Sequence, residues 1–102
     1  MTPFVLTPRA AQDIDGIWEY IAADNITAAD RVVAAIEKAI QRVAKAPGTG
    51  HFREDLADRR HRFVLAYSYL IVYRFETTPV QIIRVLHAAR DVESILGFPG
   101  ET

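Results

Sequence analysis

Hydrophobic residues recur along the first part of this chain with the period of an amphipathic helix. Thr7 followed by Pro8 is typical of a helix N-cap and the first helical position after it. Polar and acidic side chains fall between the apolar ones, so a helix running to about Ala23 would bury one stripe. The stripe consists of Ala11, Ile14, Ile17, Trp18, Ile21 and Ala22.

A second run of hydrophobic residues with the same helical period extends to about Ala46. We expect Thr27 to cap this helix, with Asp30 three residues later in an approximate capping box. The sequence Pro-Gly-Thr-Gly at residues 47–50 is a helix stop. Because so short a loop separates the two helices, they should form an antiparallel αα-hairpin, whose apolar stripes need a sheet to cover them.

The second half of the chain changes to the composition of strands. Residues 67–75 and 80–87 are rich in β-branched and aromatic side chains, and only Glu-Thr-Thr-Pro separates them, which predicts a β-hairpin. Within residues 67–75 both alternating sets of side chains are largely apolar, so this strand should be central and covered on both faces. Residues 4–6 and 62–65 are two further candidate strands, and residues 51–60 are a loop.

These elements predict an α+β fold: an αα-hairpin packed on a small, largely antiparallel sheet. The order is β-α-α-β-β-β, followed by one or two helical turns within residues 88–96. A chain of 102 residues forms one domain, which we assign to residues 1–102. Residues 97–102 read as a poorly ordered tail.

Charge is unevenly distributed, although the net charge is only −1. Residues 59–90 contain six arginines and one acidic residue, Glu76, whereas the first half carries most of the acidic side chains. Such a basic patch suggests nucleic acid or an acidic protein partner. An ordinary solvated sheet face with internal ion pairs explains the same pattern, so both interpretations stay open here.

Several classes of protein can be set aside. The chain has no cysteine, and its three histidines lack the spacing of metal ligands, so neither a metal nor a cofactor is expected. The N-terminus does not resemble a secretory signal, and no apolar run approaches the length of a membrane span, so we expect a cytoplasmic protein. There is no glycine-rich phosphate loop between a strand and a helix.

Acid–base chemistry on RNA is the catalytic alternative. His87 can act as an acid or a base near neutral pH, and Arg90 can stabilise charge on a phosphate. The competing interpretation is that His87 ends a strand and bonds to the backbone or to Asp91. Trp18 and the tyrosines are likewise more typical of a core than of a base-stacking platform.

The order of these motifs resembles the ParE branch of the ParE/RelE superfamily of type II toxins, over nearly the whole chain. The matching segments are Leu6-Thr-x-x-Ala10, Asp13-Ile-x-x-Ile-Trp-x-Tyr-Ile21, Ala-Ala-Asp-Arg31, Pro47-Gly-x-Gly50, Arg62, Tyr69-Leu-Ile-Val-Tyr-Arg74 and Ile83-Arg-Val-Leu-His-Ala-Ala-Arg-Asp91.

The resemblance implies a toxin neutralised by a co-expressed antitoxin, in a hetero-oligomer such as a heterotetramer. It also implies a choice of activity, because RelE-type members cut mRNA on the ribosome, whereas ParE-type members are thought to inhibit DNA gyrase. Where the RNA-cutting branch carries an arginine and a C-terminal tyrosine, this chain has Leu70 and Leu96. His61 and Phe63 occupy the positions of its lysine pair, and only Arg90 stays in register.

We therefore expect a gyrase inhibitor with no enzymatic activity and no sequence-specific contact with nucleic acid. The alternative is a ribosome-dependent mRNA endonuclease that uses His87 and Arg90. The residues expected to bind the antitoxin or the target are Trp18, Arg62, Arg74, Arg84, His87 and Arg90.

Overall fold

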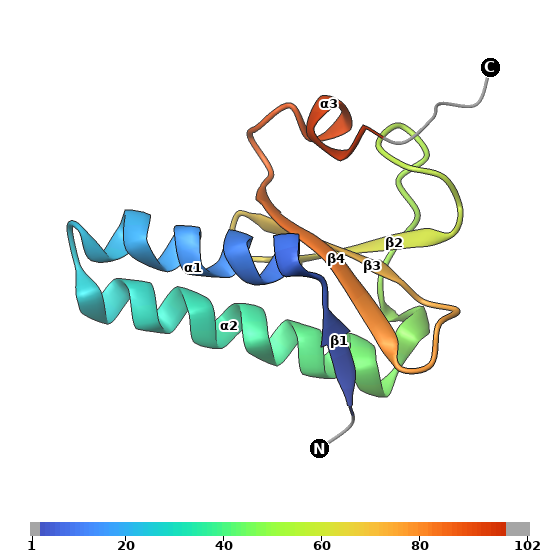
Figure 1. Cartoon of the computed structure of the whole chain (residues 1–102), viewed down its shortest axis with the longest axis horizontal. Coiled ribbons are helices and arrows are strands. Elements are labelled where there is room, and N and C mark those ends of the chain that lie inside the picture. Colours follow the sequence, from blue (N-terminus) through green and yellow to red (C-terminus); the bar gives the residue numbers. More distant parts are fainter. Residues whose placement is uncertain (1–2, 98–102) are drawn as a thin grey trace.

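The computed structural model describes residues 3–97 and confirms the expected α+β architecture (Figure 1). The strand order in the sheet is β1-β4-β3-β2, with β1 parallel to β4 and the other pairs antiparallel. The elements are β1 (Phe4–Leu6), α1 (Pro8–Ala22), α2 (Ile26–Lys45), the short 3-10 helix η1 (Pro47–Thr49), β2 (His61–Ala66), β3 (Tyr69–Arg74), β4 (Val80–His87) and α3 (Val92–Leu96).

The caps of the two long helices explain the tight αα-hairpin. The Thr7 hydroxyl accepts the backbone N–H of Ala10 at 3.1 Å, as expected of an N-cap. The predicted cap of α2 was wrong, since Asn25 rather than Thr27 takes this position and accepts the N–H of Ala28 at 3.0 Å. Asn25 has an extended backbone and caps as well as a threonine does, so α2 starts two residues earlier and the connection shortens.

One face of the sheet packs against the αα-hairpin. Ile36, Ile40 and Val43 of α2 meet Ile71 and Tyr73 of β3 in a single buried cluster. Burying such side chains is the main favourable term in the folding of a chain this small. The two long helices lie side by side and project beyond the sheet (Figure 1).

Tyr73 also ties the end of α2 to the sheet. Its fully buried hydroxyl donates to the carbonyl of Pro47 at 2.7 Å and accepts the N–H of Gly50 at 2.8 Å. Burial raises the pKa of this hydroxyl. A Cβ at residue 50 would lie 2.5 Å from the Tyr73 hydroxyl, so the close approach requires glycine there.

The opposite face of the sheet packs against α3, so the central strand is covered on both faces as predicted. Leu70, Val72 and Leu86 form a second buried cluster with Val92 of α3. This helix is shorter than the predicted segment 88–96, and Gly97 follows it with a φ of 62°. The remainder of the predicted tail, residues 98–102, lies outside the described residues.

The turn between β2 and β3 differs from the predicted strand over residues 67–75. Ala66 pairs with Tyr69, which leaves Tyr67 and Ser68 as a two-residue turn. Tyr67 has a φ of 52°, the left-handed conformation that such turns require. The alternation of apolar side chains continues through this turn, so periodicity alone could not reveal it.

Helix α1 completes the edge of β4 where β1 ends. Strand β1 pairs only with the first three residues of β4, Val80 to Ile82. Beyond them, the Thr7 hydroxyl donates to the carbonyl of Ile83 at 2.8 Å, and Asp13 accepts the N–H of Val85 at 3.0 Å. The helix therefore substitutes for a longer strand at this edge.

The same Asp13 carboxylate holds Arg84 in a two-pronged ion pair. Its oxygens accept from Arg84 Nε at 2.7 Å and from Nη2 at 3.0 Å. Both side chains are largely buried, at 14% and 13% exposure. The hydrogen bonds that Arg84 donates to Asp13 raise the pKa of Arg84 above its ordinary value. One carboxylate on α1 thus satisfies a backbone group and a charge on β4.

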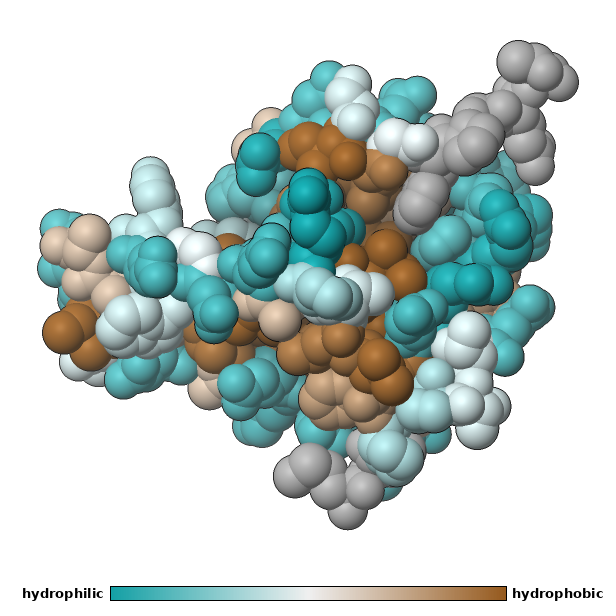
Figure 2. Space-filling view, viewed as in Figure 1, coloured by the Kyte–Doolittle hydropathy of each residue, from teal (hydrophilic) through white to brown (hydrophobic). Residues whose placement is uncertain are grey.

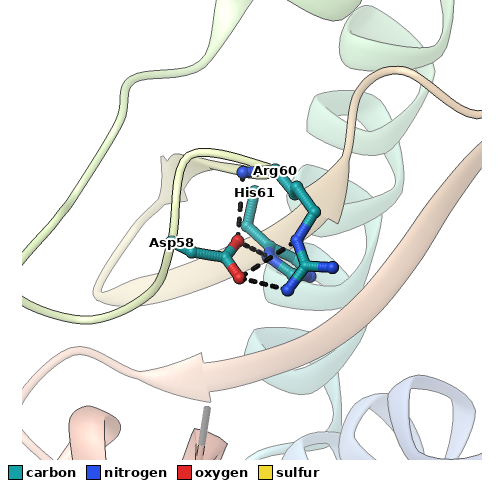
Figure 3. Close-up of polar contacts among 3 residues, drawn as sticks. All are labelled: Asp58, Arg60 and His61. Carbon is teal, nitrogen blue, oxygen red and sulfur yellow. Dashed lines mark hydrogen bonds and ion pairs between the residues drawn. The ribbon is translucent and has the colours of Figure 1, made fainter. Parts of the chain in front are cut away.

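Asp58 organises the loop that leads into β2 (Figure 3). It accepts the backbone N–H of Arg60 at 3.0 Å and the Arg60 guanidinium at 2.6 Å. It also lies 2.9 Å from Nδ1 of the buried His61, which must carry the proton because an ionised carboxylate can only accept. The Arg60 hydrogen bonds, and then that from His61, hold the pKa of Asp58 well below its usual range.

We predict that Asp13→Ala destabilises the fold more than loss of an exposed ion pair. It leaves the Arg84 charge and the Val85 N–H largely buried without their partner, which should cost about 2–3 kcal/mol. Urea unfolding measures this loss. Adding Arg84→Met should recover part of it, because no unpaired charge then remains. The control is Asp55→Ala, which breaks the exposed pair with Arg53. Equal losses for Asp13→Ala and Asp55→Ala would contradict the assignment.

The contribution of Asp58 to the free energy of unfolding should depend on pH. Its folded-state pKa is depressed, so its stabilisation is present above the unfolded-state value of about 4 and is lost as pH falls below it. Asp58→Asn should therefore lower the free energy of unfolding by about 1 kcal/mol at neutral pH, and the difference from wild type should shrink in acid. Chemical denaturation at several pH values tests this, with Asp15→Asn on the exposed side of α1 as control. A difference that does not change with pH would refute it.

Candidate functional site

A groove of about 560 Å³ lies between α1 and the adjacent ends of β3 and β4. It is the place where helix, sheet and the segment after β4 meet. Its lining combines apolar and aromatic side chains with a few polar groups, which is typical of a recognition site. The lining residues are Gln12, Asp13, Gly16, Ile17, Tyr20, Tyr69, Val85, Leu86, His87 and Arg90.

The helical wall of the groove is set by the spacing along α1. Gly16 and Tyr20 lie three and seven residues after Asp13, so the three residues share one side of the helix. A Cβ at Gly16 would meet nothing within 4 Å, and the missing side chain therefore widens the groove without being required by packing. Tyr20 is 82% exposed, which makes its ring available to a partner.

The sheet wall is formed by a cross-strand pair. Tyr69 of β3 pairs with His87 of β4, and their rings meet edge to face at 5.2 Å. Nδ1 of His87 accepts the N–H of Ala89 at 3.0 Å, so Nε2 carries the proton in the neutral ring. The predicted bond from this histidine to the backbone is present.

A tight turn after β4 brings Arg90 to the groove. Its backbone N–H donates to the carbonyl of His87 at 3.0 Å. The Arg90 side chain is exposed and makes no hydrogen bond or ion pair with any residue between 3 and 97. The Asp13 carboxylate is already occupied by Arg84 and Val85. Arg90 is therefore the charge that the groove offers to a ligand.

Two of the other predicted binding residues lie at the far end of the sheet. Arg62 is stacked between the rings of Phe52 and Phe75, at 4.2 and 4.6 Å, and donates to the carbonyl of Gly50 at 2.8 Å. Arg74 ends β3, five residues from Tyr69, which places the two about 17 Å apart along the strand.

The remaining two predicted residues carry structural contacts. Arg84 is held by Asp13, and the Trp18 indole N–H donates to Asp30 at 2.8 Å, which links α1 to α2. Trp18 is still 36% exposed. The structure thus brings together only His87 and Arg90 of the six predicted binding residues.

Ion pairs account for much of the basic segment seen in the sequence. Arg60 pairs with Asp58, and Arg59 pairs with Glu54 while its guanidinium lies 4.3 Å from the Phe52 ring. The acidic partners lie before residue 59, outside the window in which arginines dominate. The interpretation as a solvated face with internal ion pairs therefore describes this part of the chain.

Apolar packing surrounds Leu70 and Leu96, for which the resemblance implies an arginine and a tyrosine in RNA-cutting relatives. Leu70 is 6% exposed, and Leu96 packs against the cluster that contains it. Neither side chain can transfer a proton or bind phosphate. Among residues 3–97 no three His, Cys, Asp or Glu side chains are arranged to hold a metal ion.

The site residues predicted from the sequence do not include Gly16, Tyr20 or Tyr69. Tyr20 offered a signal, because it is a large aromatic side chain that falls outside the apolar stripe of α1. Figure 2 shows hydrophobic residues at the surface at the free end of the αα-hairpin, on its left. Ile26, the first residue of α2, is 60% exposed. No helix within the described part of the chain could span a bilayer.

Comparison with known proteins identifies the family. The family model of the ParE toxin of type II toxin–antitoxin systems, parDE, matches residues 4–92. Toxin ParE1 of Caulobacter vibrioides is 32% identical over 95% of this chain and all of its own length. The protein Y4kP of Sinorhizobium fredii is 36% identical, over 88% of this chain and 92% of its own.

A solved structure shows the same fold. A chain of the chromosomal ParDE toxin–antitoxin system of P. aeruginosa superimposes with a TM-score of 0.69 at 20% identity, covering 85% of this chain and 96% of its own. The family description is that of a toxin and names no enzymatic reaction. The family model and the curated relative both span most of the sequence, and the chain therefore belongs to the ParE family of toxins of type II toxin–antitoxin systems.

Proposed function

We propose that this toxin arrests growth by binding DNA gyrase in the cytoplasm, without cutting RNA, and that a cognate antitoxin neutralises it. The observation that carries the proposal is the apolar packing around Leu70 and Leu96. In the RNA-cutting branch these positions hold groups that act on RNA, and here they belong to the hydrophobic cluster beneath α3. We infer that a toxin without these groups acts by binding.

An antitoxin partner follows from the family. The solved neighbour is a ParDE system, a toxin–antitoxin pair. We expect a hetero-oligomer, for example a heterotetramer, in which a segment of the antitoxin covers the helical hairpin and a sheet edge. An exposed strand edge and an apolar groove are the two surfaces that peptide segments commonly occupy.

The groove beside α1 is the recognition site that we propose for the target or the antitoxin. Tyr20 offers an exposed ring, and Arg90 offers a guanidinium without an internal partner. Together they would take an apolar side chain next to a carboxylate. Exposed tyrosine and arginine side chains contribute strongly to protein interfaces when a partner buries them.

A ribosome-dependent mRNA endonuclease is the second candidate. His87 and Arg90 line the same groove, and an imidazole and a guanidinium are the groups that phosphate cleavage needs. The imidazole has its Nδ1 engaged by the Ala89 N–H, which leaves a single ring nitrogen for chemistry. This candidate makes a separate prediction about RNA.

Purified toxin should inhibit DNA supercoiling by gyrase, and mRNA should remain intact in cells that express it. A supercoiling assay and mapping of mRNA ends after induction give the two readouts. If gyrase kept its full activity at every toxin concentration, and codon-specific cuts disappeared with Arg90→Ala, the endonuclease would replace the gyrase inhibitor.

Tyr20→Ala and Arg90→Ala should each weaken binding to gyrase or to the antitoxin by about tenfold, the loss expected for one interface anchor. Both side chains are exposed, so urea midpoints should stay unchanged. Arg9→Ala is the matched control, because Arg9 is also exposed on α1 but does not line the groove. Retained affinity in both groove variants would exclude this groove as the recognition site.

A further inference from the structure

Helix α2 carries a basic ridge on its exposed side. Its members are spaced by seven, four and three residues, which places them within about 60° of one another around the helix. The ridge spans about 21 Å along the axis. It consists of Arg31, Lys38, Arg42 and Lys45, and all four are exposed.

The basic ridge has no internal partner. None of its four side chains makes a hydrogen bond or ion pair with another residue between 3 and 97. None has an acidic residue three or four positions away, and Lys38, Arg42 and Lys45 are instead neighbours of like charge, an arrangement that destabilises a helix. The helix dipole favours cations in the last turn, which explains Arg42 and Lys45 but not Arg31 or Lys38.

A second groove, of about 270 Å³, borders the basic ridge. Small side chains from α2 and β2 line it, and the β2–β3 turn forms its wall. Leu65 and Tyr67 stand on this wall and are 58% and 59% exposed. The groove is lined by Ala35, Lys38, Ala39, Arg42, Leu65, Ala66 and Tyr67.

Tyr67 occupies a position where its side chain brings no benefit to the turn. Its φ of 52° is a conformation that glycine or asparagine adopts more readily. The ring is exposed and is absent from the buried core clusters of the described residues. A partner that covers the ring would give this residue a role that the turn itself does not.

We propose that the basic ridge and this second groove together bind an acidic amphipathic helix of the antitoxin, an inference that rests on the proposed function. Acidic residues spaced by four and three positions on that helix would face Lys38, Arg42 and Lys45. Its apolar residues would cover Leu65 and Tyr67, with the small side chains of the groove allowing close approach.

Each of the two grooves has a lining residue next to the β2–β3 turn. Ala66 lines the second groove and pairs with Tyr69, which lines the first. A single antitoxin segment that follows this edge of the toxin would reach both grooves. Nucleic acid fits this surface less well, because a phosphate backbone would leave the exposed leucine uncovered.

Titration of the cognate antitoxin into purified toxin tests the proposal. Lys38→Glu should weaken binding by at least about tenfold and flatten its salt dependence. Arg9→Glu makes the same change in charge outside the basic ridge and both grooves and should bind like wild type. Leu65→Ser should weaken binding with the salt dependence retained. Circular dichroism confirms that each variant is folded.

Three outcomes would overturn the proposal, and they are distinguishable. If the antitoxin binds wild type and all variants equally, this surface is not the interface, and the proposed function stands. If the antitoxin neither binds wild-type toxin nor restores growth, the proposed function fails and this inference fails with it. If Lys38→Glu abolishes binding of the toxin to a short DNA duplex but leaves antitoxin affinity unchanged, the ridge serves nucleic acid.

Discussion

The carboxylate of Asp13 fixes the relation between the helical hairpin and the sheet. It completes the edge of β4 where the short first strand ends, and it neutralises Arg84 in a largely buried position. The directions of side chains around a helix are fixed relative to one another. Placing Asp13 against the sheet therefore also decides where Gly16 and Tyr20 point. The groove beside α1 therefore depends on an interaction that looks purely structural.

The sequence predicts the scaffold of this protein well, because the scaffold follows local periodicity. Spacings of three and four identify both helices, and the two apolar faces of the central strand predict its cover on each side. What local patterns cannot show is pairing between distant residues. Asp13 and Arg84 are 71 positions apart, so Arg84 looks like a free surface cation until the fold brings Asp13 to it.

For the same reason, the arginines predicted to form one binding surface do not lie together in the structure. Arg62 is held between two aromatic rings, and Arg74 lies at the other end of the sheet from His87. Arg90 remains available because the Asp13 carboxylate, which lines the same groove, is already paired with Arg84. The basic ridge of α2 was not predicted from the sequence. Its cations are interspersed with acidic residues that lie on other sides of the helix, so the ridge is recognised only when the exposed side is known.

The residues that we propose to face a partner contribute little to the stability of the fold. Tyr20, Lys38, Arg42 and Arg90 are exposed and stand outside the buried clusters of the described chain. Such positions can change by mutation with little loss of stability, whereas substitutions at Asp13 or Tyr73 would destabilise the fold. If the proposed surfaces bind the antitoxin, a lineage of these toxins would exchange one antitoxin specificity for another through surface substitutions, and pairs in the same cell would become insulated from each other while the scaffold stays fixed.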